Sequence, residues 1–231
     1  YFYAWGRVSG GDPCHRVSFA VPTGNFGDIF AGYLAKRMGL PVERLIIATN
    51  RNDILSRFVH TGVYAAGEVY PTLSPAMDIQ IASNFERYLY YLVDQDPALV
   101  AGLLEGMGRE GRLEVASHRL DRAQADFAAV AVSDEAILAQ IRETFQQEGY
   151  ILDPHTATGV RAAQGSTDVI CLATAHPAKF AEAVTQAIGR EAPPPPALQG
   201  LLEKETRCAR LEASEAAVRA HILATLAKVN P

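Results

Sequence analysis

The chain has 231 residues, of which 48% are hydrophobic and 20% charged, and its formal net charge at pH 7 is −5. A chain of this length and hydrophobicity buries a sizeable core, as one large domain or two small ones. Lysine and arginine form no cluster, and nucleic-acid binding needs concentrated positive charge, so we expect no nucleic-acid partner. No apolar run reaches the roughly 20 residues that span a bilayer, so we expect a soluble chain that spans no membrane.

The three cysteines, Cys14, Cys171 and Cys208, are too widely spaced for a disulfide framework or a zinc ligand set. They predict a reducing compartment, and we expect a cytoplasmic protein, with an upstream targeting peptide left open. The first five residues, YFYAW, resemble the middle of a buried element more than the basic start of a signal peptide. We therefore expect a fragment that lacks an earlier half.

Residues 16–40 predict a strand, a glycine-bearing turn and a helix. Apolar residues alternate over 17–21, as in a strand, and recur at helical spacing over 29–38. Gly24 and Gly27 bracket two residues between these elements. This order directs backbone N–H groups and the positive end of a helix dipole at one point, which favours a phosphate. The residues alone leave a plain tight turn as an equal alternative.

The next elements predict an α/β fold. The apolar run 45–49 is typical of a strand buried on both faces of a parallel sheet, and a helix follows it. Strands and helices in alternation with short connections predict a doubly wound, mostly parallel sheet. We expect four parts: an α/β part over 1–95, an all-helical insertion over 96–149, a return to the α/β domain over 150–190, and a proline-rich linker with one long C-terminal helix over 191–231.

Three strand ends carry unusual residues, and ligands bind at the carboxyl ends of parallel strands. These ends are 23–28, 50–53 and 174–179. A helix cap is the favoured interpretation of 50–53. Thr174, at the end of the apolar strand 169–173, needs a hydrogen-bond partner, and a ring nitrogen or a loop amide would serve.

His155 and His176 are candidates for acid–base chemistry or metal binding. No His-x-x-x-His or Cys-x-x-Cys spacing supports a metal, so structural hydrogen bonding is the favoured interpretation of both. The chain also has no Gly-x-Ser-x-Gly elbow and no complete Walker A motif.

Five segments, in this order, resemble threonine synthase. They are VPTGNFGDIFAGY at 21–33, SPAMDIQ at 74–80, SNFER at 83–87, DPHT at 153–156 and TAHPAKF at 174–180. The resemblance covers roughly residues 1–185. It implies a pyridoxal-phosphate enzyme of fold type II, similar to tryptophan synthase β, that converts O-phospho-L-homoserine and water to L-threonine and phosphate.

The resemblance also implies site residues. Those for the cofactor share one turn and one strand end: Gly24, Asn25, Phe26 and Gly27 with backbone N–H groups toward its phosphate, Asp28 beside them, and Thr174 with its hydroxyl toward the pyridine nitrogen. The substrate candidates are Ser83, Asn84 and Arg87, the last as a contact to the substrate phosphate.

The chemistry requires a lysine that holds the cofactor as a Schiff base. The chain has four lysines, Lys36, Lys179, Lys204 and Lys228, and only Lys179 is near the expected site. Lys179 lies in the HPAKF-like motif, and the family carries its Schiff-base lysine in the N-terminal half. We therefore expect no catalytic residue here, a missing N-terminal half as partner, and no turnover and weak cofactor binding by this chain alone.

Two alternatives stay open. One is another fold type II lyase, such as a threonine or serine dehydratase, against which the segments 74–80 and 83–87 argue. The other is a non-catalytic α/β module that binds a phosphorylated small molecule or a partner, which the missing lysine supports. The oligomeric state is open between a monomer and a homodimer.

Overall fold

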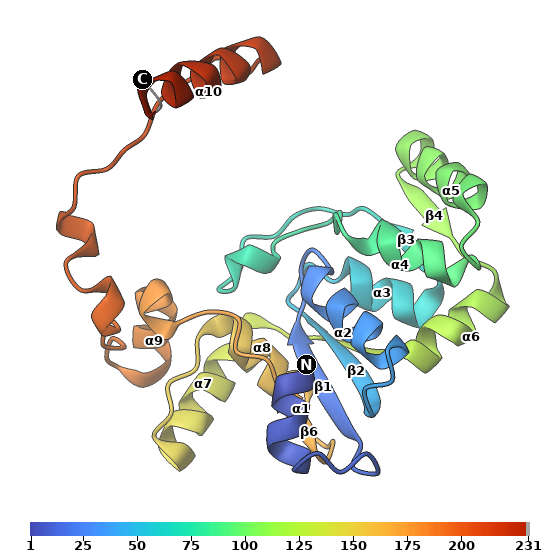
Figure 1. The fold of residues 1–231 in the computed structure, drawn as a ribbon. Coiled ribbons are helices and arrows are strands. Elements are labelled where there is room, and N and C mark those ends of the chain that lie inside the picture. Colours follow the sequence, from blue (N-terminus) through green and yellow to red (C-terminus); the bar gives the residue numbers. More distant parts are fainter. Residues whose placement is uncertain (230–231) are drawn as a thin grey trace. The chain divides into compact units, whose positions relative to one another are not determined.

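The computed structural model describes residues 1–229, and the expected helix end at 230–231 lies outside that part. The chain divides into two compact units, one over 1–193 and one from Pro194 onward. The first unit contains a four-stranded parallel sheet in the order β5-β2-β1-β6 (Figure 1). Its strands are β1 (Val17–Pro22), β2 (Val42–Thr49), β5 (Phe127–Ala131) and β6 (Val169–Cys171).

Helices connect these strands, and a short antiparallel ribbon stands apart from the sheet. The helices of the first unit are α1 (Phe2–Ser9), α2 (Gly27–Arg37), α3 (Ile54–Thr61), α4 (Phe85–Leu92), α5 (Pro97–Glu110), α6 (Ser117–Asp126), α7 (Asp134–Glu148), α8 (Pro154–Ala162) and α9 (Ala181–Ile188). The ribbon pairs β3 (Val63–Ala65) with β4 (Arg112–Glu114). Two 3-10 turns matter for the site: η1 (Pro75–Met77) and η2 (Pro177–Phe180).

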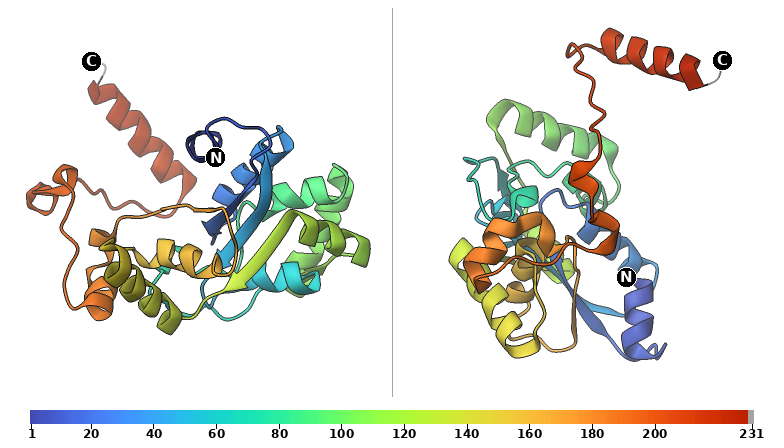
Figure 2. Two further views of the ribbon diagram at one scale, coloured as in Figure 1. Left: turned by 90° about the horizontal axis from the view of Figure 1, so that it is seen from below. Right: turned by 90° about the vertical axis from the view of Figure 1, so that its left-hand side faces the viewer.

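The sheet separates two hydrophobic cores because successive side chains of a strand point to opposite faces. Phe19 and Ile47 belong to the core that includes residues of α2, α3 and α4. Ala20 and Ile46 belong to the core that includes residues of α7, α8 and α9. Figure 2 shows these two groups of helices on opposite faces of the sheet. The predicted doubly wound, mostly parallel sheet is confirmed.

The prediction of an all-helical segment over 96–149 is wrong. Helices α5 and α7 lie where the sequence predicts helices, but the segment also holds two strands. β4 pairs with β3, and β5 pairs with β2 as an edge strand of the main sheet. β5 has the sequence FAAVA, and alanine favours a helix. Its pairing with β2, a tertiary contact, overrides that local preference.

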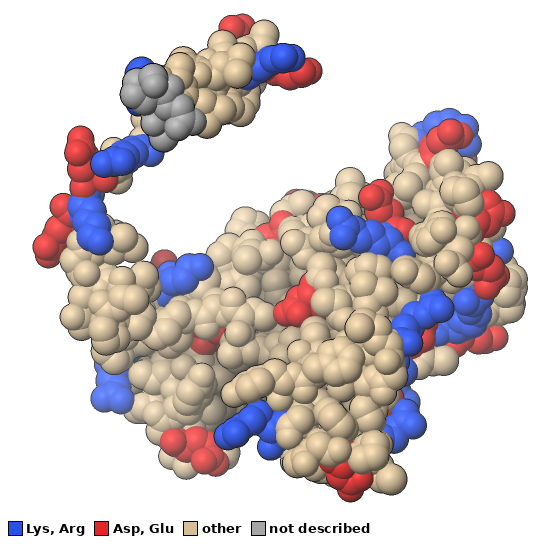
Figure 3. All heavy atoms as spheres, viewed as in Figure 1, with Lys and Arg blue, Asp and Glu red and all other residues tan. Residues whose placement is uncertain are grey.

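The second unit is described by itself. It holds two short 3-10 turns, η3 (Pro196–Leu198) and η4 (Leu201–Glu203), and one helix, α10 (Glu215–Val229). The expected long helix is therefore confined to α10, because residues 204–214 form no helix. No helix within residues 1–229 is long and apolar enough to cross a membrane. On the face drawn in Figure 3, basic and acidic side chains are interspersed.

Aromatic rings fill the core between α2, α4 and β5. Tyr88 is 1% exposed, and its ring lies edge-on to Phe127 at 5.0 Å and to Tyr33 at 5.2 Å. Its hydroxyl donates to Oδ2 of Asp126 at 2.9 Å. Burial raises the pKa of the Asp126 carboxyl, although this hydrogen bond and nearby cations act in the opposite direction.

The raised pKa of Asp126 predicts that ionisation of this carboxyl lowers the free energy of unfolding as the pH rises. Its folded pKa lies above the unfolded one, so its contribution to stability is present at low pH and is lost as pH rises through the folded pKa. We expect Asp126→Asn, whose amide oxygen still accepts from Tyr88, to gain stability relative to the native chain as pH rises from 4 to 7, by up to about 1 kcal/mol. Urea unfolding measures this difference. The exposed control Asp121→Asn should show no such trend, and a flat difference for Asp126→Asn would contradict the assignment.

Candidate functional site

A cavity of about 280 Å³ lies at the carboxyl ends of β1 and β6. These strands are parallel neighbours, so their carboxyl ends meet at one edge of the sheet. Segments from four parts of the chain form the lining: Pro22, Gly24, Asn25 and Asp28; Ala76 and Met77; His155; and Thr174, Ala175, Lys179 and Phe180. The structure thus brings the predicted turn and Thr174 to one cavity.

The turn after β1 depends on an unusual backbone conformation at Phe26. Phe26 has φ 70°, in the left-handed region, and is the N-cap residue of α2 without a side-chain cap bond. Such a conformation costs on the order of 1–3 kcal/mol and persists where surrounding contacts enforce it. Here the ring is 1% exposed and packs on Phe85 at 5.4 Å and Phe127 at 5.5 Å. The first turn of α2 leaves N–H groups without intrahelical partners, so this end of the helix suits an anion.

Asn25 organises the turn through both its side chain and its backbone. Its Oδ1 accepts from the Gly27 N–H at 2.9 Å, so that N–H is already engaged within the turn. Its carbonyl oxygen accepts from the Asn84 backbone N–H at 3.0 Å and from Asn84 Nδ2 at 3.2 Å. The structure therefore places Asn84, a substrate candidate, as a partner of the turn.

Asp28 and Lys179 are the charged residues of the cavity lining. The Tyr1 hydroxyl lies 2.9 Å from the carbonyl oxygen of Asp28 and 3.2 Å from its Oδ1, and donates to them. Burial raises the pKa of the Tyr1 hydroxyl, and the Asp28 carboxylate raises it further. Lys179 is exposed, with Nζ 5.8 Å from the centroid of the Phe180 ring. The cavity thus contains one charge of each sign.

Thr174 lies after β6 and lines the same cavity as the turn after β1. Its side chain is exposed, and its hydroxyl has no hydrogen-bond partner among residues 1–229. The hydroxyl is therefore available to a ligand. Next to it, His176 Nδ1 accepts from the Ala178 N–H at 3.2 Å and caps η2.

The two histidines have structural hydrogen bonds, as the favoured interpretation predicts. The ring of His155 bonds to Asp153 through Nδ1 and to the Ala76 N–H through Nε2. In the described part of the chain, no group of three or more His, Cys, Asp or Glu side chains could hold a metal ion.

Arg87 lies away from this cavity. It lines a separate hollow of about 480 Å³ with Phe30, Glu86, Tyr90, Tyr91 and Val100. Ser83 is exposed at the start of α4. The structure does not bring Arg87 and the turn into one cavity, and its contact to a substrate phosphate stays a prediction.

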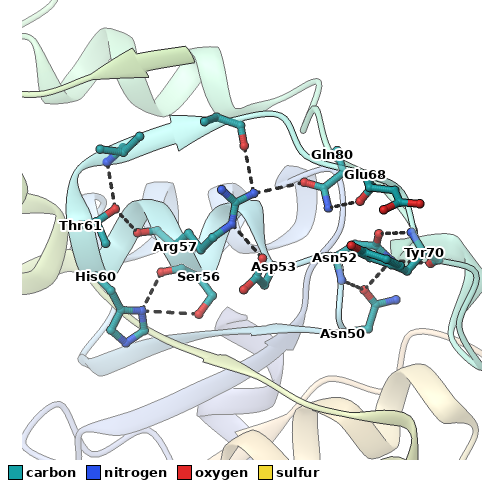
Figure 4. Close-up of polar contacts among 12 residues, drawn as sticks. Asn50, Asn52, Asp53, Ser56, Arg57, His60, Thr61, Glu68, Tyr70 and Gln80 are labelled. Carbon is teal, nitrogen blue, oxygen red and sulfur yellow. Dashed lines mark hydrogen bonds and ion pairs between the residues drawn. The ribbon is translucent and has the colours of Figure 1, made fainter. Parts of the chain in front are cut away.

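The residues 50–53 do more than start a helix. Asp53 is the N-cap residue of α3 but makes no side-chain cap bond. Asn50 is 0% exposed, and its Nδ2 donates to Thr72 Oγ1 and to Asp78 Oδ1, both at 2.8 Å. Asn52 Nδ2 donates to the Tyr70 carbonyl oxygen at 2.8 Å (Figure 4). The end of β2 is thus bonded to the segment 70–78, a role that the helix-cap interpretation missed.

A second set of bonds, made by Arg57 of α3, joins residues on either side of that segment. Arg57 forms an ion pair with Asp53 at 2.9 Å and donates to the Ala65 carbonyl oxygen at 2.9 Å. Its Nη2 also donates to Gln80 Oε1 at 3.3 Å, and Gln80 Nε2 donates to the Glu68 carbonyl oxygen at 3.0 Å (Figure 4). The sequence did carry a signal for such a network, namely the four polar residues 50–53 in succession after a buried strand, but it was interpreted as a helix cap.

The chain was compared with families and proteins of known identity. The family model "Threonine synthase, C-terminal" matches residues 156–222. The threonine synthase of Pseudomonas aeruginosa is 48% identical over 228 residues, which cover 96% of this chain and 48% of that protein. The threonine synthase of Saccharomyces cerevisiae is 43% identical over 210 residues, which cover 81% of this chain and 41% of that protein.

Solved structures agree with these relatives. The crystal structure of PLP-bound threonine synthase from Brucella melitensis matches with a TM-score of 0.84 and 46% identity, over 88% of this chain and 45% of that chain. The crystal structure of threonine synthase from yeast matches with a TM-score of 0.87 and 38% identity, over 99% of this chain and 51% of that chain. The chain belongs to the threonine synthase family.

Family membership confirms the resemblance that the five sequence segments carry, and the fold is that of threonine synthases. The chain corresponds to the C-terminal portion of the family and spans about half the length of the curated relatives it matches. The turn after β1 and the strand end at Thr174 both lie in the part aligned with the yeast structure, which covers 99% of the chain.

Gly24 allows close packing at this threonine synthase turn. A Cβ at Gly24 would lie 2.9 Å from the Met77 Cα and 3.0 Å from the Ala76 carbonyl oxygen, both backbone atoms. We expect Gly24→Ala to displace the segment 74–80 and to lower the free energy of unfolding by about 1–3 kcal/mol. Gly102→Ala in α5, where a Cβ meets nothing within 4 Å, should instead stabilise by about 0.5–1 kcal/mol. Urea unfolding of both variants measures this, and equal effects would contradict the close packing.

Proposed function

We propose that the complete protein carrying this chain is a pyridoxal-phosphate enzyme that converts O-phospho-L-homoserine and water to L-threonine and phosphate. The observation that carries this proposal is the single cavity that joins the turn at 24–28 to Thr174 in a member of the threonine synthase family. A solved relative with 46% identity to this chain is PLP-bound.

The cavity offers a group for each end of the cofactor, its phosphate and its ring nitrogen. Its volume of about 280 Å³ is close to the lower end of ligand pockets, about 300 Å³. The N–H groups of the first turn of α2 other than that of Gly27, which Asn25 engages, would bind the phosphate. The Thr174 hydroxyl, in the same lining, has no hydrogen-bond partner within residues 1–229 and would meet the ring nitrogen.

When bound, pyridoxal phosphate supplies an electron sink that stabilises a carbanion on the substrate. The residues of this chain orient it. A neutral hydroxyl at Thr174, in place of a carboxylate, would leave the ring nitrogen largely unprotonated and would so temper the electron-withdrawing power of the ring. Asp28, a carboxylate in the same lining, disfavours an anion beside it, whereas Lys179 contributes a cation to that lining.

The covalent anchor belongs, in this proposal, to the N-terminal half of the protein. Lys179 is the lysine in the cavity lining, but it lies in the HPAKF-like motif that the resemblance separates from the anchoring lysine. The N-terminal half is thus the proposed partner of this chain. We also propose a cytoplasmic location, which the three free cysteines support.

Neither alternative gains support from a specific observation. The relatives and solved structures described above are threonine synthases, with no dehydratase among them. A non-catalytic module would need no counterpart to the Thr174 hydroxyl opposite the anion-binding turn, whereas the structure provides both in one cavity.

The complete protein tests this proposal. We expect it to release phosphate from O-phospho-L-homoserine and to form L-threonine, and we expect this chain alone to do neither. Thr174→Val in the complete protein should lower kcat/KM by roughly tenfold, because one hydrogen bond to the cofactor, worth about 1.5 kcal/mol, is lost. Thr225→Val in α10 is the matched control and should leave kcat/KM unchanged. A complete protein that binds pyridoxal phosphate but leaves this substrate intact would contradict the proposed reaction.

A separate experiment locates the lysine that holds the cofactor as a Schiff base. Borohydride fixes pyridoxal phosphate to the lysine that holds it, so mass spectrometry of the reduced protein locates that lysine. We expect a peptide from the N-terminal half in the complete protein and no labelled peptide from this chain alone. A label on this chain that disappears in Lys179→Met would show that Lys179 is the anchor and that the assignment is wrong.

A further inference from the structure

The segment 74–80 forms one wall of the cavity. Ala76 and Met77, within η1, line the cavity directly. The same two residues cover the bare Cα of Gly24, where a Cβ would lie 2.9 Å from the Met77 Cα. The shape of the cavity beside the turn therefore depends on where this segment is held.

The ends of this wall are bonded to the sheet and to α3. Ser74 Oγ lies 3.0 Å from Asn50 Nδ2, which donates to it, and Asp78 accepts from Asn50 and Asn52. Gln80 bonds to Arg57. In the middle of the wall, the Ala76 N–H donates to Nε2 of His155 at 3.2 Å, across 79 positions in the sequence.

His155 is built into the start of α8. It is 3% exposed, and its ring packs against Phe180 with 4.7 Å between centroids. Asp153, 1% exposed, is the N-cap residue of α8, and its Oδ1 accepts from the His155 N–H at 2.9 Å. The same oxygen lies 3.1 Å from His155 Nδ1, and the Thr156 hydroxyl donates to Oδ2.

These contacts assign the tautomer of His155. Burial by itself would raise the pKa of Asp153, but hydrogen bonds from His155 and Thr156 outweigh it and lower the pKa. A carboxylate only accepts hydrogen bonds, so Nδ1 carries the hydrogen. Nε2 then keeps a lone pair, which the Ala76 N–H needs, and a protonated Nε2 would face another donor.

The occupied lone pair excludes proton abstraction by this Asp–His pair, although His155 lines the cavity. We propose that His155 is a positioning residue: as a neutral imidazole oriented by Asp153, it holds the Ala76 amide and thereby the wall 74–80 against the cofactor-binding turn. The relevance of this wall to pyridoxal phosphate rests on the proposed function, whereas the bond to Ala76 does not.

Three variants separate the acceptor from the bulk of the ring. His155→Leu removes the acceptor, and His155→Gln keeps one, since its amide oxygen reaches the place of Nε2. Asp153→Ser keeps a favoured N-cap residue for α8 but removes the carboxylate that accepts from Nδ1, so the tautomer of His155 is no longer fixed. This variant supplies a test that does not depend on the folding of His155→Leu. His221→Leu, at an exposed position of α10, is the matched control.

Two measurements read the effect. Hydrogen exchange of the Ala76 amide in the 231-residue chain should accelerate by about threefold to tenfold in His155→Leu and Asp153→Ser, and stay within about twofold of native in His155→Gln and His221→Leu. The affinity of the complete protein for pyridoxal phosphate should fall in the same two variants. The ring ¹⁵N spectrum of the native chain should show His155 neutral with hydrogen on Nδ1.

The outcomes are distinct. Unchanged Ala76 exchange in both His155→Leu and Asp153→Ser would overturn the proposal, as would faster exchange with unchanged cofactor affinity. If the native complete protein binds no pyridoxal phosphate, the proposed function fails, and the Ala76 exchange rates still decide whether His155 holds the wall.

Discussion

The burial of the Phe26 ring is the constraint on which the anion-binding turn depends. A phenylalanine adopts a left-handed backbone only where its surroundings enforce it, and here Phe85, Tyr88 and Phe127 surround the ring. These residues come from α4 and β5, so the aromatic core determines the backbone of the turn. The conformation in turn places the start of α2 beside the cavity, whose lining includes Asp28. The packing of the aromatic core therefore determines both the stability of this part of the protein and the geometry of the site.

The parallel sheet brings Thr174, which follows β6, to the same site as the turn after β1. β1 lies between β2 and β6, so the segments that follow β1 and β6 leave the sheet at the same edge. The polar residues that follow β2 do not line this cavity but hold one of its walls in place. Asn50 and Asn52 bond to the segment 70–78, and His155 bonds to Ala76 within it, so the wall of the cavity is held from two elements, the end of β2 and α8. Each of these side chains is buried, which makes its hydrogen bonds costly to lose.

Local patterns in the sequence were enough to predict the turn at 24–28, Thr174 and the doubly wound fold. Alternation and helical spacing are local properties, and the family motifs are contiguous. The strand β5 was missed because its alanines favour a helix and its pairing with β2 is a distant contact. The bonds of Asn84 to the turn and of Asn50 to Asp78 were missed for the same reason, since they join residues 59 and 28 positions apart. Arg87 shares the SNFER motif with Asn84, yet Asn84 bonds to the turn while Arg87 lines a separate hollow, and no local pattern distinguishes them.

The most direct test of the account is a titration of the ¹⁵N-labelled 231-residue chain with pyridoxal phosphate, followed by amide NMR spectra. The account predicts that the signals of residues 24–30 shift first, together with those around Thr174, and that inorganic phosphate moves the first set alone. Shifts that begin instead at the hollow lined by Arg51, Asp53 and residues 131–135, or no shift at residues 24–30 at saturating ligand, would contradict it.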